Sequence, residues 1–325
     1  MKTLYFDCVA GASGDMIIGS LIDLGADAIH LKQELLKLGI GSEYEITVKK
    51  VNKNGITATK FDVILKEEPN QSHFQHHDPS HEHTHDHLNN HTHHYGHKDH
   101  GQTQDLHEEH SHNHHSHESH EHTRGHHCDE GHGHSHDHHL EDHSHTNHAQ
   151  SHSHHHRTFS SIKKMIEEST LQEDVKSLSI AIFQKIAEAE GKIHGVSIDK
   201  VHFHEVGAVD SIIDIVGTAI LICSIKPDLI SSSSLPVGTG KIAIDHGIYP
   251  VPAPATLEIL KGVPIEQSNI RFELTTPTGA AIIAVLAEQF GSIPSMTVES
   301  IGYGAGTKTF PSYPNVIRTI IGHSD

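Results

Sequence analysis

The segment VHFHEVGAVDSIIDIVG, Val201–Gly217, joins an alternating start to a long apolar run. Apolar and polar residues alternate over Val201–Glu205, which predicts an extended segment. From Val206 to Ile225 most positions are apolar, and Lys226-Pro227 follows, so we predict a core helix that ends there. The elements predicted on either side of this segment set the fold class.

Strands and helices are predicted on both sides of the segment, without strict alternation. Before it we predict a strand at Thr3–Asp7 and two helices at Gly14–Leu24 and Ala28–Leu38. A hairpin of Tyr44–Val51 with Ile56–Leu65 follows, and then two further helices at Phe159–Glu168 and Asp174–His194. After it we predict a strand at Asp228–Ser232, a Pro-rich entry to a short helix at Pro250–Pro254, and a second helix from Pro277 onward. A glycine loop at Gly302–Gly306 and a last strand at Asn315–Ile321 follow. This mixture predicts an α+β fold with a mixed sheet and several helices.

Most histidines of the chain lie in one stretch. The 325 residues include 40 His, and 34 of them, all but six, fall between His73 and His156. The same stretch holds 14 acidic, two basic and only seven apolar residues, too few apolar groups to offset the entropy of ordering it. We predict a disordered insertion at 69–157. It separates an N-terminal α+β segment at 1–68 from a second one at 158–325, which packs with the first and carries the site.

Histidine at alternate positions of the insertion, as at His81, His83 and His85, offers neutral imidazole, a ligand that suits nickel, copper and zinc. The insertion therefore predicts handling of a transition metal. Repeat slippage in a tolerant loop is the alternative interpretation. The pattern does not select one metal.

Charge and cysteine usage exclude several classes of protein. Of the net charge of −19, −12 belongs to the stretch from His73 to His156 (two basic minus 14 acidic residues), and the −7 that remains comes with no basic stripe for nucleic acid. The three cysteines suit a reducing compartment. Asp7 interrupts any signal peptide, and the apolar run Ile212–Ile225 is too short to span a bilayer. We expect a cytoplasmic protein that binds neither nucleic acid nor membranes.

The opening segment also carries candidate metal-binding and catalytic residues. His202 and His204 share one face of the extended part, and Glu205 stands where the helix begins. Asp210 and Asp214 are four residues apart, so both carboxylates lie on one stripe of the helix. Two imidazoles and up to three carboxylates could therefore meet in one pocket. Alternatively, Glu205 and Asp210 cap the helix and the histidines bond to neighbouring loops.

The first predicted helix start suits an anion and a cation together. Ser13 and Gly14 supply a hydroxyl and free backbone N–H groups for an anion, while Asp7 and Asp15 could hold a cation. A simple helix cap by Ser13 or Asp15 is the alternative. We therefore treat this start as a candidate site for both kinds of ligand.

A second helix start has the composition of a phosphate site. Thr276, Thr278 and Gly279 combine hydroxyls with unpaired amides, although a plain cap would explain one of the threonines. Lys308 follows the predicted glycine loop and supplies a positive charge. His246, ahead of the Pro-rich entry, is a further candidate metal ligand or a solvent-facing loop residue.

Five motifs taken together resemble the LarC family of nickel-insertion proteins. They are the opening segment and FDCVAGASGDM at Phe6–Met16, HGIYPVPAPATLEILKG at His246–Gly262, ELTTPTGAA at Glu273–Ala281 and IGYGAGTKTFPSYPNVIR at Ile301–Arg318. The resemblance covers nearly all of the chain outside the histidine-rich stretch. A variable His-rich insertion at this place is also a feature of the family.

The resemblance implies a nickel chelatase or cyclometallase of the lyase class. Such a protein places Ni²⁺ in pyridinium-3,5-bisthiocarboxylic acid mononucleotide to make the nickel-pincer cofactor of lactate racemase, in a reaction that depends on CTP with Mg²⁺ or Mn²⁺. The implied partners are the mononucleotide, a CTP-binding domain and other proteins of the lactate racemase pathway. Family members usually continue past the PNVIR motif into that C-terminal domain, whereas this chain stops at Asp325. We expect it to need a separate CTP-binding domain or subunit. The alternative is a nickel store or metallochaperone without catalysis.

Overall fold

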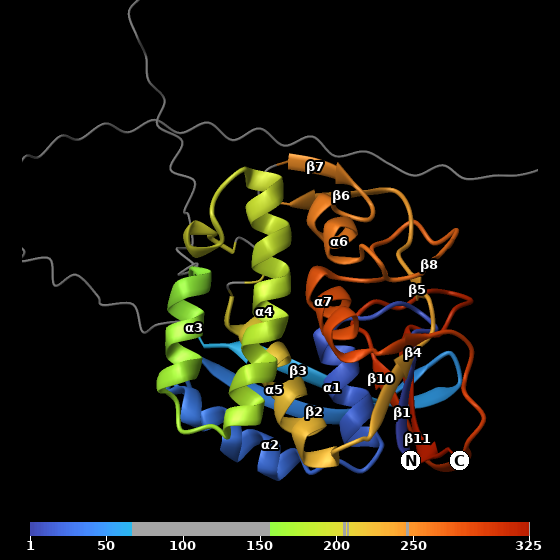
Figure 1. The fold of residues 1–325 in the computed structure, drawn as a ribbon. Coiled ribbons are helices and arrows are strands. Elements are labelled where there is room, and N and C mark those ends of the chain that lie inside the picture. The colour runs from blue at the N-terminus through green and yellow to red at the C-terminus, as the bar shows by residue number, and fades with distance from the viewer. Residues whose placement is uncertain (67–156, 204–205, 207, 245–246, 325) are drawn as a thin grey trace, which may run out of the picture. The chain divides into compact units, whose positions relative to one another are not determined.

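A mixed sheet of seven strands in the order β2-β3-β10-β11-β1-β4-β9 forms the base of the fold. Its strands are β1 (Lys2–Asp7), β2 (Tyr44–Lys53), β3 (Ile56–Leu65), β4 (Leu229–Ser232), β9 (Gln289–Phe290), β10 (Thr297–Ala305) and β11 (Val316–His323). Strand β1 pairs antiparallel with β11 and parallel with β4. The first and last strands of the described chain are therefore neighbours, and both chain ends lie at the same edge in Figure 1.

The computed structural model describes residues 1–66, 157–203, 206, 208–244 and 247–324. The histidine-rich stretch lies outside these residues, so its predicted disorder and the domain limits at 68 and 157 stay predictions. The described parts before and after the stretch pack together, because helix α1 (Gly14–Asp23) contacts helix α5 (Val209–Ile225). No described helix is long and apolar enough to cross a membrane.

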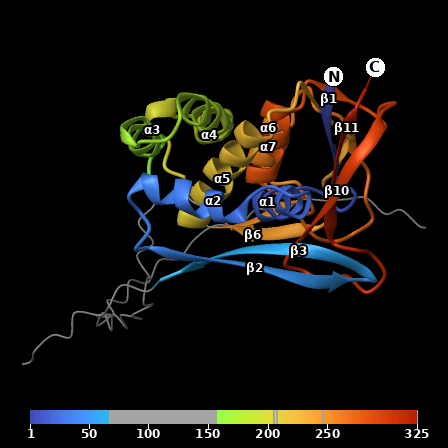
Figure 2. The ribbon, with the colours of Figure 1, turned by 90° about the horizontal axis from the view of Figure 1, so that it is seen from below.

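Helix α5 lies at the centre of the helical layer. Ile212, Ile213, Ile215 and Val216 are completely buried, and the helix contacts four other helices. The remaining described α-helices are α2 (Ala28–Leu35), α3 (Phe159–Glu168), α4 (Glu173–His194), α6 (Pro254–Ile259) and α7 (Pro277–Leu286). Figure 2 shows the helices on one side of the β2–β3 hairpin. Because α5 packs against α1, α2, α4 and α7, its apolar sequence is buried on several sides.

The α+β fold class predicted from the sequence is confirmed, and most element limits differ by only a few residues. Helix α5 begins at Val209 rather than Val206, with Ala208 in an extended conformation as its N-cap. The predicted extended segment before it is not a strand in its described part, where His202 makes a single bridge to Thr158. Two short pairings were not predicted: β5 (Leu235–Pro236) with β8 (Ile265–Glu266), and β6 (Lys241–Ile244) with β7 (Gly247–Pro250).

The predicted glycine loop at Gly302–Gly306 is wrong, because Gly302 and Gly304 lie inside strand β10. A β-carbon added at Gly304 would stand 1.7 Å from the carbonyl oxygen of Met16, and one at Gly302 would stand 2.1 Å from that of Ser20. These glycines therefore let α1 lie directly on the strand. The glycine-rich pattern serves packing of α1, which carries Ser13–Asp15 at its start.

Candidate functional site

Three helices begin around one pocket of about 340 Å³. Helix α1 contributes Ser13–Asp15, helix α5 contributes Asp210 and Ser211, and helix α7 contributes Thr276–Thr278. The charged residues that line the pocket are Asp15, Lys60, Asp62, Asp210, Asp214 and Glu273. Helix starts carry partial positive charge, so the pocket combines carboxylates for a cation with backbone dipoles for an anion.

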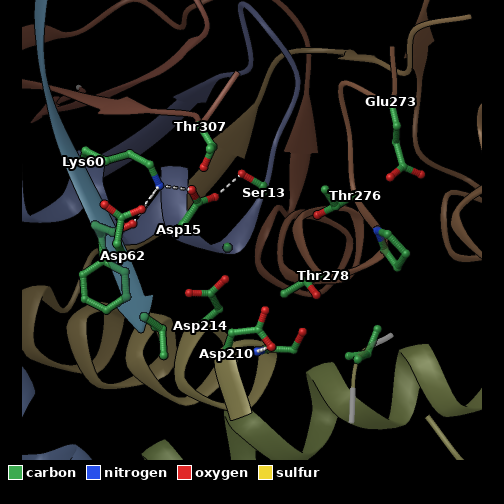
Figure 3. A pocket seen from close by; sticks show the side chains of 16 residues that line it. Ser13, Asp15, Lys60, Asp62, Asp210, Asp214, Glu273, Thr276, Thr278 and Thr307 are labelled. Atoms are coloured by element: carbon green, nitrogen blue, oxygen red, sulfur yellow. Dashed lines mark hydrogen bonds and ion pairs between the residues drawn. The ribbon is translucent and has the colours of Figure 1, made fainter. Parts of the chain in front are cut away.

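Lys60 on β3 joins two of these carboxylates. Its buried Nζ donates to Asp15 Oδ2 at 2.6 Å, to the carbonyl oxygen of Phe61 at 3.0 Å, and lies 2.7 Å from Asp62 Oδ1. Burial alone would lower the pKa of Lys60, but the two carboxylates outweigh it and raise that pKa. Ser13 donates its hydroxyl to the other oxygen of Asp15. Both oxygens of Asp15 are therefore engaged (Figure 3).

Asp214 differs from the acids held by Lys60. Its Oδ1 atom is buried and makes no hydrogen bond to any residue that the structure describes. Burial, with the negative charges of Asp15 and Asp210, raises the pKa of Asp214 well above its usual range, although the Asp15 backbone N–H donates to its carboxyl. A β-carbon at Gly14 would stand 2.6 Å from Asp214 Oδ2. The ionised form of Asp214 is therefore disfavoured, and its carboxyl packs against the start of α1.

The three threonines at the start of α7 divide into two with structural bonds and one that faces the pocket. Thr275 is completely buried and donates its hydroxyl to the Pro236 carbonyl oxygen at 2.8 Å. Thr276 caps α7 by accepting from the Gly279 N–H at 3.2 Å. Thr278 lines the pocket and has no such structural bond within the described chain. The plain-cap alternative therefore applies to Thr276.

Asp7 and Lys308, both predicted as site residues, are not part of the pocket lining. Asp7 accepts hydrogen bonds from the guanidinium of Arg318, so its carboxylate already has a cation partner. The exposed Lys308 places its ammonium 5.6 Å from the centre of the Phe272 ring. Neither residue is brought together with Asp15 and Asp214, because tertiary packing directs each to another partner.

The predicted histidine cluster is only partly described. His202 is exposed and does not line the pocket, while its neighbour Phe203 is buried against two other phenylalanine rings. His204, Glu205 and His246 lie outside the described residues. Within the described part of the chain, no three His, Cys, Asp or Glu side chains form a group that could hold a metal ion. The metal assignments to these histidines therefore stay predictions.

The lining residues that the sequence pattern did not identify include Lys60, Asp62, Glu273 and Thr307. Lys60 and Asp62 are two positions apart on β3, so they share one face of the strand. Two opposite charges on a strand face that is otherwise apolar were the signal in the sequence that could have identified these two lining residues. Glu273 and Thr307 lie outside helices and strands, where the local pattern indicates nothing about the pocket.

Replacing Lys60 by Met is expected to lower the free energy of unfolding by about 2–3 kcal/mol, because two partly buried carboxylates lose their cation. Nearby charges lower the pKa of Asp62 despite its burial. The stability from that lowered pKa is present above the unfolded pKa of about 4 and disappears as the pH falls through the folded value. Urea unfolding at several pH values should therefore show the loss at pH 7 and a smaller loss in acid.

Lys53→Met is the matched control for Lys60. Lys53 is also a buried lysine of the hairpin, but its Nζ donates to the oxygens of Thr307, Lys308 and Thr309 and to no carboxylate among the residues that the structure describes. Its loss is expected to cost about 1 kcal/mol with little pH dependence. Equal costs for the two variants, at all pH values, would show that the carboxylates do not depend on Lys60.

The family model described as nickel insertion protein matches residues 4–325 of this chain, and the chain therefore belongs to this family. A relative from Clostridium acetobutylicum, named pyridinium-3,5-bisthiocarboxylic acid mononucleotide nickel insertion protein, is 44% identical over 325 residues, covering 100% of this chain and 65% of the relative. A relative of the same name from Geobacillus kaustophilus is 40% identical over 322 residues, covering 99% of this chain and 60% of the relative. The chain thus spans less than two thirds of these relatives. No solved structure is similar to it.

Proposed function

We propose that the protein inserts Ni²⁺ into pyridinium-3,5-bisthiocarboxylic acid mononucleotide and so makes the nickel-pincer cofactor of lactate racemase. The observation that carries the proposal is the Asp214 carboxyl, whose Oδ1 atom is buried without a hydrogen bond in the described chain, at a pocket where three helices begin. The chain that holds this pocket belongs to the nickel insertion family. The names of the relatives support the choice of substrate. The protein would then act as a nickel chelatase, or cyclometallase, of the lyase class.

Asp214 is proposed to accept the proton released from the substrate ring. Insertion breaks a ring C–H bond and forms a carbon–nickel bond, so one proton must leave the carbon. An arriving divalent cation favours the ionised form of Asp214, so a protonated Asp214 first loses its own proton to solvent. The resulting carboxylate is then a base that can take the ring proton. Asp210 and Glu205 are the other candidate carboxylates.

Delivery of nickel is proposed to involve the histidines. The histidine-rich stretch gathers Ni²⁺, and His202, His204 and His246 pass it toward the pocket, since imidazole suits this metal. Asp15 is already held by Lys60 and Ser13, which fix the position of its carboxylate at the pocket. CTP with Mg²⁺ or Mn²⁺ is expected on a C-terminal domain or subunit, with other lactate racemase pathway proteins as further partners.

The second candidate function is nickel storage or a metallochaperone role without catalysis. The observation that favours it is the concentration of 34 histidines between His73 and His156. Many exchanging imidazole sites would hold metal without any chemistry on a substrate. The two functions differ in whether a covalent nickel–carbon product forms.

A single-turnover assay separates the two functions. The full chain is mixed with Ni²⁺, CTP, Mg²⁺ and the bisthiocarboxylated mononucleotide, with and without the CTP-binding domain of a relative, and the product is followed by mass spectrometry. Insertase activity predicts a nickel adduct that has lost one proton, at least when the domain is present. Absence of the adduct in both mixtures, with nickel still bound to the protein, supports storage and rejects the insertase.

A further inference from the structure

We propose that Thr278 binds the phosphate of the mononucleotide, with its hydroxyl and its backbone N–H as donors. The inference rests on the function proposed above and names one residue for one group of the substrate. Thr278 is only 7% exposed, lines the pocket, and its hydroxyl makes no hydrogen bond to any residue that the structure describes. Thr278 Oγ1 is not among the described side-chain atoms that are sealed from solvent without a partner, so a ligand in the pocket can reach it. Figure 3 shows Thr278 across the pocket from Lys60.

The two preceding threonines are already used by the fold. The Thr275 hydroxyl donates to the carbonyl oxygen of Pro236, and the Thr276 hydroxyl accepts from the N–H of Gly279. Three similar side chains in one motif therefore have three different environments. Thr278 is the one whose hydroxyl remains for a ligand within the described structure.

The backbone of α7 leads to the same residue. Pro277 has no N–H, and the N–H of Gly279 is taken by the Thr276 cap, so Thr278 carries the remaining N–H of the first turn. At the start of α1, by contrast, the Asp15 N–H already donates to Asp214. The partial positive charge of a helix start favours a phosphate at α7.

The start of α7 is held in place before any ligand arrives. The Thr276 N–H donates to the carbonyl oxygen of Ala12 at 3.0 Å. A β-carbon at Gly279 would stand 2.0 Å from the same oxygen, so only glycine permits this contact. Because contacts between backbone atoms already fix the start of α7, binding of a phosphate requires little further ordering of this helix and costs little conformational entropy.

The carboxylates of the pocket oppose a bare phosphate, so inorganic phosphate is a poor probe. Nicotinamide mononucleotide is better, since its pyridinium ring adds a positive charge. Nicotinamide riboside is the same molecule without the phosphate. The difference in affinity between these two ligands therefore isolates recognition of the phosphate group.

Isothermal titration of the full chain with both ligands tests the inference. The wild-type protein is expected to bind the mononucleotide at least tenfold more tightly than the riboside. Thr278→Val should weaken mononucleotide binding about tenfold and leave riboside binding unchanged, because only the bond to the charged group is lost. Thr278→Ser keeps the hydroxyl and should bind like the wild type. Thr275→Val, with its hydroxyl remote from the ligand, should keep the wild-type preference.

Three results would overturn the inference: equal binding of the two ligands by the wild type, no binding of either, or an equal effect of Thr278→Val on both. The nickel-adduct assay distinguishes this failure from failure of the proposed function. If the adduct forms while phosphate is not recognised, only the Thr278 inference is wrong. If phosphate is recognised through Thr278 and no adduct forms, the site stands and the insertase is wrong.

Discussion

Replacing Gly304 by Ala is expected to lower the free energy of unfolding by about 3 kcal/mol, the upper end of the usual cost of forcing a methyl group into a packed interior. The new β-carbon would stand 1.7 Å from the Met16 carbonyl oxygen and 2.7 Å from the Ser20 nitrogen, both backbone atoms of α1. Backbone cannot rotate away as a side chain can, so α1 must move off β10. Urea unfolding followed by circular dichroism measures the loss.

Gly39→Ala is the control for the effect of a methyl group on a glycine. Gly39 has a φ of +76° with no atom within 4 Å of an added β-carbon. Replacing Gly39 by Ala is therefore expected to lower the free energy of unfolding by about 1 kcal/mol, which is the strain of the left-handed backbone conformation alone. Similar losses for Gly304→Ala and Gly39→Ala would contradict the close packing of α1 on β10. A shift of α1 should also reduce nickel insertion, since Ser13–Asp15 line the pocket.

Asp214→Asn is expected to slow formation of the nickel adduct by at least about 100-fold, the usual contribution of a general base. Asparagine has nearly the same shape and can still accept from the Asp15 N–H, so the pocket should remain folded. The adduct assay under single-turnover conditions measures the rate. A rate close to that of the wild type would show that another group takes the ring proton.

The same substitution is expected to increase stability at neutral pH. Because the folded pKa of Asp214 is raised, its favourable contribution is fully present below the unfolded pKa and is lost as the pH rises toward the folded value. The asparagine variant avoids this loss, which amounts to about 1.4 kcal/mol per pH unit while the two states differ by one proton. Unfolding experiments from pH 4 to pH 8 should show a gain that grows with pH.

Asp62→Asn supplies the opposite control. The pKa of Asp62 is lowered by Lys60 and Lys49 against the effect of burial, so its contribution is present at neutral pH and is lost in acid. This variant should be less stable than the wild type at pH 7. If Asp214→Asn is destabilising at pH 7 in the same way, burial does not disfavour the ionised form of Asp214.

Helices, strands and the core could largely be predicted from local patterns. The apolar run that became α5, the Asn54-Gly55 turn between β2 and β3, and the Thr276-Pro277 start of α7 each depend on neighbouring residues. Asn54 and Gly55 both have positive φ, as the turn requires. Local periodicity and turn chemistry suffice for such elements, because the physical preferences act over a few residues.

Local patterns also identified part of the site. Ser13, Asp15, Asp210, Asp214, Thr276 and Thr278 were predicted and all line the pocket. Each lies at or near the start of a helix, where a cap residue or a polar group on an apolar stripe is visible in the sequence. Their positions were therefore predictable, but their individual chemical roles were not.

Only tertiary packing determined the chemical roles of these residues. A role depends on the groups that lie within bonding distance, and these groups come from distant segments of the chain. Lys60 engages Asp15, Arg318 engages Asp7, and the Gly304 backbone supports α1, although each pair is far apart in the sequence. Three threonines that look alike in sequence differ only in what packs against them. Charge, burial and hydrogen bonding act between neighbours in space, and the pattern of a single segment does not contain them.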